Sequence, residues 1–168
     1  MKKILILLLL LSCLHVFAQK DTVLFNSGNK KEKAHDYVGA ITDWTKALKV
    51  NPKFENAYYK RAIAEHLFSQ DYKGAIFDYT KVIELNPTNE LAYVNRGQCE
   101  YALHGYKFAI EDFSKAIELN PKNGYAYCSR AVAKYDAGLK VDVCTDFNKA
   151  IELGYRQASI IKKDYCSK

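Results

Sequence analysis

The sequence contains none of the short motifs that mark the common catalytic sites. It has no glycine-rich phosphate loop, no Gly-x-Ser-x-Gly nucleophile turn and no His-Glu-x-x-His zinc motif. None of its five cysteines forms a Cys-x-x-Cys pair, and its four histidines are scattered without a carboxylate or cysteine at ligand spacing. We therefore predict that the protein is not an enzyme and that it binds no metal or cofactor.

The sequence also lacks a contiguous run of basic residues. Residues 1–18 hold two of its 25 lysines and arginines and no acid, so the remainder keeps 23 basic and 19 acidic residues. These charges are interleaved throughout, whereas a phosphate backbone requires a continuous basic stripe. We do not expect nucleic acid to be a partner.

Long apolar runs are absent except at residues 4–11, which follow the positively charged Met1-Lys2-Lys3. This run is too short to span a membrane, and Val16-Phe17-Ala18 resembles a small-residue cleavage site. We interpret residues 1–18 as a signal peptide and Gln19 as the mature N-terminus. The protein is then exported, periplasmic or secreted, with no integral membrane span after cleavage.

An alternative for the leader is lipid anchoring. Leu10-Leu11-Ser12-Cys13 loosely resembles a bacterial lipobox, which would make Cys13 a lipidated N-terminus. Leu11 is unusual at its place in such a motif, and His15-Val16-Phe17 is an atypical start for a tether. Plain cleavage is the favoured interpretation.

The three prolines reveal an internal repeat. They stand in Asn51-Pro52, Asn86-Pro87 and Asn120-Pro121, which are 35 and 34 residues apart. Proline cannot continue a helix, so each pair marks the end of one. The resulting repeats cover residues 21–54, 55–89, 90–123 and 124–157, and the second has one extra residue near Ser69-Gln70.

Equivalent positions in these repeats carry similar side chains. One large aromatic recurs at Trp44, Tyr79, Phe113 and Phe147. One turn earlier, small side chains that allow close helix approach stand at Ala40, Ala75, Ala109 and Val143. A matching small column lies on the preceding helix, at Gly28, Ala62, Gly97 and Ala131. The pattern predicts a helix-turn-helix unit repeated four times.

These columns resemble the tetratricopeptide repeat family over residues 21–157. The resemblance implies an all-α fold, a right-handed α-solenoid of four helix-turn-helix repeats that forms one domain over residues 19–168. Lys31 and Tyr155 depart from the family pattern in the first and last repeats, where atypical residues are expected. We expect residues 156–166 to form a capping helix whose apolar face, with Ala158, Ile161 and Tyr165, covers the end of the stack.

A charge pattern suggests how the repeats stack. Asp43, Asp78, Asp112 and Asp146 recur in the second helices, and Arg61, Arg96 and Arg130 recur in the first helices of repeats two to four. We predict pairs between neighbouring repeats: Asp43–Arg61, Asp78–Arg96 and Asp112–Arg130. Pairing within one repeat is the alternative, and it leaves Asp43 without an arginine.

The cysteines after the leader allow one disulfide. Cys144 lies near the start of the fourth repeat's second helix, and Cys166 lies near the end of the capping helix. Two antiparallel helices joined by a short turn would bring both to similar heights, and export permits disulfides. We predict a Cys144–Cys166 bridge and interpret Cys99 and Cys128 as small buried hydrophobic residues.

In tetratricopeptide proteins the first helices line a concave groove in which partners lie. The resemblance carries this partner-binding role to Phe25, Asn29, Tyr59, Ile63, His66, Leu91, Val94, Gln98, Tyr101, Tyr125, Val132 and Tyr135. This surface is rich in tyrosine and aliphatic residues, which favours an extended peptide or an amphipathic helix of low charge. The alternative is that some of these residues only pack between neighbouring helices.

Chaperone-binding members of the family hold a C-terminal carboxylate with lysines, arginines and asparagines. Asn29 and Asn95 match two of those places, but Phe25, Lys60 and Leu91 replace others. We do not expect such a clamp. The predicted function is a non-enzymatic scaffold or adaptor of the bacterial envelope that binds a protein or peptide. The alternatives are a self-associating structural protein and a lipid-anchored accessory of a membrane complex.

Overall fold

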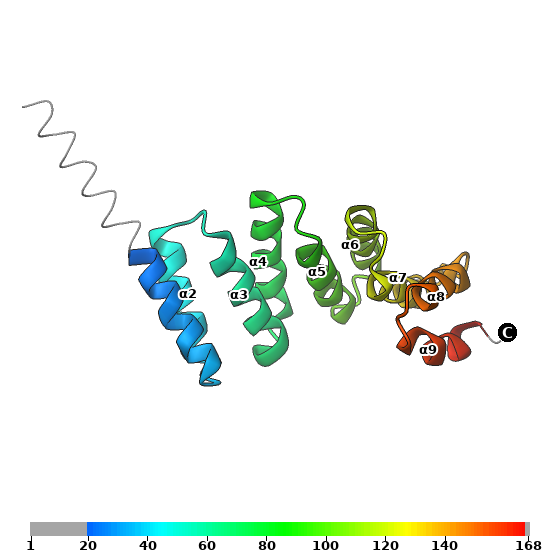
Figure 1. The fold of residues 1–168 in the computed structure, drawn as a ribbon, viewed down its shortest axis with the longest axis horizontal. Coiled ribbons are helices and arrows are strands. Elements are labelled where there is room, and N and C mark those ends of the chain that lie inside the picture. The colour runs from blue at the N-terminus through cyan, green and yellow to red at the C-terminus, as the bar shows by residue number, and fades with distance from the viewer. Residues whose placement is uncertain (1–19, 167–168) are drawn as a thin grey trace, which may run out of the picture. The chain divides into compact units, whose positions relative to one another are not determined.

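The computed structural model describes residues 20–166, and all regular structure in that range is helical (Figure 1). The chain divides into two compact units, one ending at Gln70 and one beginning at Asp71. The predicted signal peptide and Cys13 lie outside the described residues. Within residues 20–166, no helix is both long and apolar enough to cross a membrane.

The first unit holds a helix that reaches residue 33, then α2 (Tyr37–Val50), α3 (Glu55–Ala64) and the π-helical turn η1 (Glu65–Ser69). The second unit holds α4 (Tyr72–Leu85), α5 (Glu90–Ala102), α6 (Tyr106–Leu119), α7 (Gly124–Asp136), α8 (Val143–Glu152) and α9 (Gln157–Cys166). In the second unit each helix packs against its neighbours in the chain, as the ribbon from α4 to α9 shows (Figure 1). Helices α5 and α6 form the predicted pair of residues 90–123, and α7 and α8 form that of residues 124–157.

The repeated aromatic and small residues form the core, as their spacing predicts. Trp44, Tyr79, Phe113 and Phe147 are each 2% exposed or less. Gly28 is required because a Cβ there would lie 2.5 Å from Nε1 of Trp44. Gly97 meets the same need in the second unit, where a Cβ would lie 3.0 Å from the ring of Phe113. In these two repeats the aromatic ring of the second helix therefore packs against a first helix that has no side chain at the contact.

The extra residue of the second repeat lies in η1. A π-helical turn bonds each residue five positions back, so it holds one residue more than an α-helical turn. Gln70 ends η1 in the left-handed conformation with φ of 53°, and its backbone N–H donates to the carbonyl of Glu65. The extra residue is thus accommodated at the end of the first helix of this repeat, before α4 begins at Tyr72.

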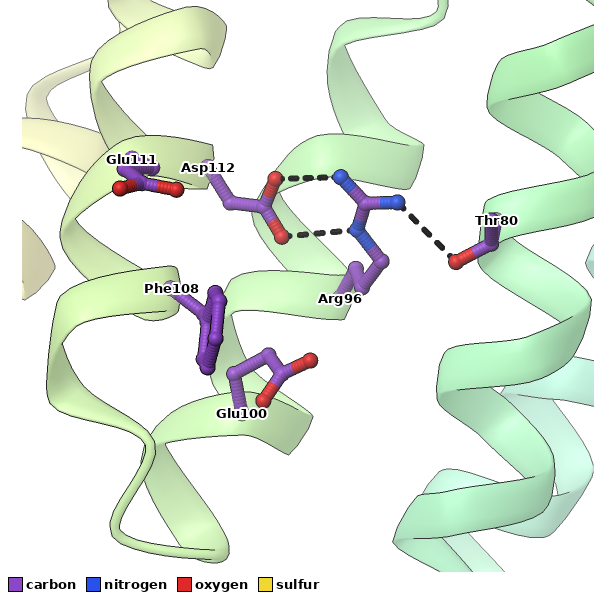
Figure 2. Close-up of a pocket in the computed structure, with 6 residues that line it drawn as sticks. All are labelled: Thr80, Arg96, Glu100, Phe108, Glu111 and Asp112. Carbon is purple, nitrogen blue, oxygen red and sulfur yellow. Dashed lines mark hydrogen bonds and ion pairs between the residues drawn. The ribbon is translucent and has the colours of Figure 1, made fainter.

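Asp112 and Asp146 each pair with the arginine of their own repeat, so the predicted Asp78–Arg96 and Asp112–Arg130 pairs are wrong. Nη2 and Nε of Arg96 lie 2.7 and 2.8 Å from the carboxylate oxygens of Asp112 (Figure 2). Arg130 binds Asp146 in the same way, at 2.6 and 2.9 Å. The antiparallel packing of the two helices in one repeat brings these side chains face to face.

Each arginine nevertheless links two repeats through its third nitrogen. Nη1 of Arg96 donates to the hydroxyl of Thr80 at 3.0 Å, as Figure 2 shows. Nη1 of Arg130 donates to Ser114 at 3.2 Å, and in the first unit Nη1 of Arg61 donates to Thr45 at 2.9 Å. These arginines therefore connect neighbouring repeats through a hydrogen bond to a hydroxyl and not through the ion pair that the sequence suggested.

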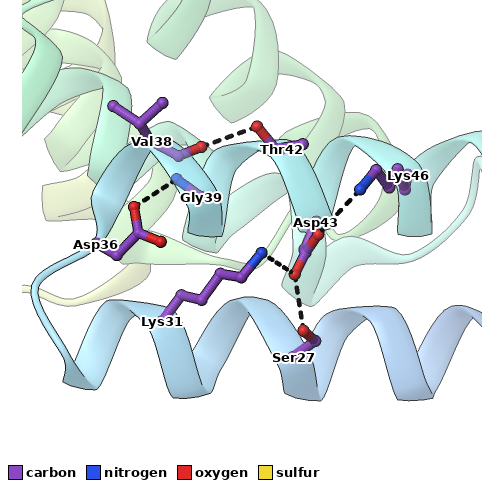
Figure 3. Close-up of polar contacts among 8 residues, drawn as sticks. All are labelled: Ser27, Lys31, Asp36, Val38, Gly39, Thr42, Asp43 and Lys46. Atoms are coloured by element: carbon purple, nitrogen blue, oxygen red, sulfur yellow. Dashed lines mark hydrogen bonds and ion pairs between the residues drawn. The ribbon is translucent and has the colours of Figure 1, made fainter.

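Asp43 in the first unit obtains its cations differently, and the predicted Asp43–Arg61 pair is also wrong. Its carboxylate accepts a hydrogen bond from Ser27 at 2.7 Å and pairs with Lys31 at 2.7 Å and with Lys46 at 3.3 Å (Figure 3). The bonds from Lys31 and Ser27 outweigh burial and lower the pKa of Asp43 to about 2. The first repeat thus replaces the arginine with a hydroxyl and two lysines.

Asp112 depends on its arginine more than Asp146 does, because Lys134 also pairs with Asp146 at 2.9 Å. We expect Arg96→Met to lower the free energy of unfolding by roughly 3 kcal/mol, the low end of the cost of stripping a buried charge of its partner. Arg130→Met should cost clearly less, because Lys134 still neutralises Asp146. Urea unfolding of both variants at neutral pH checks this. Equal losses, or a larger loss for Arg130→Met, would contradict it.

Candidate functional site

The predicted groove residues of the first helix have structural roles in the first unit. The ring of Phe25 lies 4.8 Å from that of Phe54, and it packs against the core formed with Trp44. The amide oxygen of Asn29 accepts a hydrogen bond from Nε1 of Trp44 at 3.2 Å. These two side chains hold the unit together, so for them the alternative of packing is the better account.

The remaining predicted residues of this unit are half-buried. Tyr59 and Ile63 lie on α3, and His66 lies in η1. Burial lowers the pKa of His66, which keeps its imidazole neutral near pH 7. The neighbouring Lys60 pairs with Glu32 at 2.8 Å, so its ammonium is already matched by a carboxylate.

In the second unit the predicted residues lie on α5 and α7. Leu91 is 54% exposed, whereas Val94 is only 5% exposed and belongs to a core cluster with Ile117. Val132 is half-buried against the core around Phe147. Leu91 can meet a partner. Val94 cannot, because its own side chain faces the interior.

Three polar members of the predicted set on α5 and α7 form hydrogen bonds that join the third and fourth repeats. The amide nitrogen of Gln98 on α5 donates to the hydroxyl of Tyr125 on α7. The hydroxyl of Tyr101 on α5 donates to the carboxylate of Asp136 at the end of α7. Burial first, and then this bond, raise the pKa of Tyr101 well above its usual value. The phenol therefore remains protonated, a donor that is already oriented.

Helix α9 and the turn before it add two tyrosines that the sequence analysis did not place in the groove. Tyr165 of α9 packs edge-on against Tyr135, with ring centroids 4.6 Å apart. Tyr155, just before α9, meets Tyr125 in the same way at 5.6 Å. The sequence signal was present, since Tyr165 lies on the apolar face of the predicted capping helix. That position predicts that Tyr165 is buried under the cap, and it does not predict that Tyr165 extends the binding surface of α5 and α7.

We call the resulting surface the tyrosine face. It consists of Gln98, Tyr101, Tyr125, Tyr135, Asp136, Tyr155 and Tyr165. Its tyrosines are half-buried, so their rings are fixed by packing while part of each remains in contact with water. Burial also raises the pKa of Tyr155 and of Tyr165, so these phenols are protonated at neutral pH as well. The face offers aromatic area with hydroxyl donors and acceptors and little formal charge.

A disulfide fixes α9 beside this face. Cys144 at the start of α8 and Cys166 at the end of α9 are joined, with Cα atoms 5.9 Å apart. A cavity of about 170 Å³ lies there, lined by Tyr135, Lys140, Val143, Cys144, Asp164, Tyr165 and Cys166. The bridge therefore holds the helix that supplies Tyr165.

The other two cysteines are buried. Burial raises the pKa of the Cys99 thiol to about 12 and that of Cys128 to about 11. Neither is a reactive thiolate at neutral pH. Within residues 20–166, no group of three histidine, cysteine or acidic side chains is arranged to hold a metal ion.

Comparison with protein families identifies the repeat unit. Residues 56–89 and residues 91–123 each match a family model described as tetratricopeptide repeat. A comparison with curated proteins gives no match.

Solved structures share the fold. A crystal structure of MamA superposes with a TM-score of 0.77 at 24% identity, covering 88% of this chain and 86% of MamA. The first tetratricopeptide domain of Spaghetti (RPAP3), described as bound to the HSP90 peptide SRMEEVD, gives 0.66 at 28% identity, covering 71% and 94%. The Arabidopsis OM64 tetratricopeptide domain gives 0.65 at 28% identity, covering 71% and 98%. These matches confirm the predicted fold class, an all-α solenoid of helix-turn-helix repeats.

The disulfide should control the order of α9. Because the bridge closes a loop between residues 22 positions apart, its loss should destabilise the docked α9 by about 3 kcal/mol. We expect a Cys144→Ser/Cys166→Ser variant to exchange the amide hydrogens of α9 much faster, while those of α6 keep their protection. Hydrogen exchange read by mass spectrometry measures both. Unchanged protection of α9 would show that packing alone holds it.

Proposed function

The chain belongs to the tetratricopeptide-repeat family, and we propose that it is a non-enzymatic adaptor whose tyrosine face binds an extended segment of a partner protein. Its fold supports a protein–protein interaction module. The finer proposal, a peptide on the tyrosine face, rests on one observation: tyrosines from α5, α7 and α9 meet on one surface with their rings already packed. The hydroxyls of Tyr101 and Tyr125 are already bonded.

The chemistry of this face favours a guest of low charge. Tyrosine buries a large area at small entropic cost, and its hydroxyl bonds backbone groups of a peptide. Leu91 adds an exposed apolar side chain on the same side of α5. Asp136 carries a formal charge within the face and accepts the bond from Tyr101, and the ammonium of Lys140 lies 5.8 Å from the ring centroid of Tyr135. A peptide with aromatic or aliphatic side chains and free backbone groups fits these partners.

An acidic C-terminal tail fits the chain poorly. The HSP90 peptide in the RPAP3 structure ends in Glu-Glu-Val-Asp. In the present chain, the side-chain oxygen of Asn29 already accepts a hydrogen bond from Trp44, and the ammonium of Lys60 is already paired with Glu32. In place of these two side chains, the tyrosine face has Lys140 beside it. We therefore propose a different class of guest from the one in that structure.

The leader places this adaptor outside the cytoplasm in our proposal. A positively charged start, a short apolar run and a small-residue site are typical of a signal peptide, and the bridge between Cys144 and Cys166 suits an oxidising space. Lipid anchoring through Cys13 is the competing mode of export.

The binding proposal is tested with a displayed library of random short peptides selected on residues 19–168. We expect enriched sequences of low net charge. Their affinity, measured by fluorescence anisotropy, should fall at least about tenfold in Tyr101→Ala and in Tyr135→Ala, because buried aromatic anchors dominate such interfaces.

Phe77→Ala is the matched control. It removes an aromatic ring that is 56% exposed from α4, a second helix outside the tyrosine face. This variant should bind like the wild type, and circular dichroism should show that all three variants keep their helicity. If no peptide is enriched, or if the three variants bind alike, the tyrosine face is not the binding site. A mass that rises with protein concentration would then favour self-association.

The export proposal predicts the mature N-terminus. Expressed in a bacterial host with its leader, the chain should be recovered from the periplasm or medium with a mass that begins at Gln19. A chain beginning at Cys13 and carrying acyl groups would show anchoring instead. A protein that begins at Met1 and stays in the cytosol would contradict both modes of export.

A further inference from the structure

A second candidate site lies on the opposite side of α5 from the tyrosine face. It is a cavity of about 190 Å³ lined by Thr80 of α4, Arg96 and Glu100 of α5, and Phe108, Glu111 and Asp112 of α6 (Figure 2). Arg96 and Glu100 are four residues apart and share one side of the helix, whereas Gln98 and Tyr101 lie on the other. All of the lining belongs to the second unit.

The cavity has an excess of negative charge. It holds three carboxylates and one guanidinium, and Arg96 is already bonded to Asp112 through two nitrogens. Among the described residues, neither Glu100 nor Glu111 has a hydrogen bond or an ion pair that satisfies its carboxylate. Burial, followed by repulsion from Asp112, raises the pKa of Glu100. A cation placed here would relieve that repulsion.

One wall of the cavity is apolar. The ring of Phe108 is 58% exposed and lies beside the side chain of Glu100 in Figure 2. The carboxylate of Glu100 has this position because Gly105 has no side chain: a Cβ there would lie 2.8 Å from Oε2 of Glu100. The equivalent residues before α2 and α4 are Asp36 and Asp71, whose side chains cap their helices. The third repeat therefore has no side chain immediately before α6, and this leaves room for the carboxylate of Glu100 beside Phe108.

Two other repeats show what occupies the equivalent place. In the first repeat, Lys31 lies four residues after Ser27, and its ammonium is 2.7 Å from Asp43. In the fourth repeat, Lys134 lies four residues after Arg130, and its ammonium is 2.9 Å from Asp146. In the second repeat this position is held by Glu65, whose carboxylate lies 3.7 Å from Nε of Arg61. Glu100 lies four residues after Arg96 and holds the same position in the third repeat. The ammonium that two repeats supply from their own chain is replaced there by another carboxylate.

We propose that this cavity receives a primary ammonium group on a short alkyl chain. The ammonium takes the place that Lys31 and Lys134 occupy in their repeats, beside the aspartate. The methylene groups lie against the ring of Phe108, and a butylammonium group is of a size that such a cavity admits. The donor is either a lysine side chain of a partner protein or a free alkyl diamine, since both present the same group.

The test is an NMR titration of residues 19–168 with Nα-acetyl-lysine methylamide and, separately, with 1,5-diaminopentane. We expect saturable shifts of the amide signals of Glu100, Phe108 and Glu111 with either probe. The probe that binds more tightly identifies the source. Nα-acetyl-norleucine methylamide, which has the chain without the ammonium, should give no saturable shifts.

Glu100→Lys restores the residue type that the first and fourth repeats carry. It should bring its own ammonium to Asp112, abolish binding of both probes and leave the melting temperature unchanged or higher. Glu100→Gln keeps the shape and should weaken binding about tenfold or more, because a charged hydrogen-bond acceptor is lost. Glu118→Lys makes the same change of charge on an exposed part of α6 and should bind like the wild type.

Several outcomes would overturn the proposal. These are the absence of saturable shifts in the wild-type protein, equal binding by Glu100→Lys, and equal shifts from the norleucine probe. If Glu100→Lys fails to fold, the comparison of Glu100→Gln with Glu118→Lys decides, and equal affinities there would also reject the site. Tyr101→Ala should keep full binding of the amines, so failure of the tyrosine face and failure of this cavity are distinguishable.

Discussion

The structure depends on one constraint: a buried carboxylate in each second helix must be matched by a cation. Asp43, Asp78, Asp112 and Asp146 are each 5% exposed or less, and an unpaired charge at such a depth costs several kcal/mol. Where an arginine meets this requirement, its fork binds the aspartate with two nitrogens and a hydroxyl of the preceding repeat with the third. The group that neutralises the core of one repeat therefore also connects it to the one before.

The repeats meet the same constraint with different side chains, and this is where they diverge. The first repeat uses Ser27 with two lysines, the fourth uses Arg130 with Lys134, and the third relies on Arg96. The third repeat is therefore left with more negative charge around its aspartate than the first and fourth repeats have. Variation that the core tolerates thus produces a cavity with its own recognition chemistry, without any change in the helices around it.

The sequence predicts the buried positions that recur in every repeat. It does not predict ion-pair partners or the exposure of single surface positions, because the repeat carries no information on these. The aromatic and small columns are constrained in every copy, so their burial follows from period and side-chain size alone. Arg96 could face Asp78 or Asp112 at nearly equal sequence separations, and only the packed helices decide. Val94 and Leu91 lie on neighbouring positions of α5, yet one is buried and the other exposed. Tyr155 was missed as a surface residue because it stands where the other repeats have proline, and Tyr165 because no column extends beyond the fourth repeat.

Helix α5 carries both proposed sites, and its packing against α6 links them. The tyrosine face needs α5 in place, because Tyr101 and Gln98 orient their partners on α7. The cavity lies where α5 meets α6, beside the Arg96–Asp112 pair that holds these helices together. A cation that binds only the folded arrangement stabilises it in proportion to its concentration and affinity. An ammonium ligand at Glu100 would therefore strengthen the attachment of the helix that presents Tyr101, without touching the peptide that Tyr101 contacts.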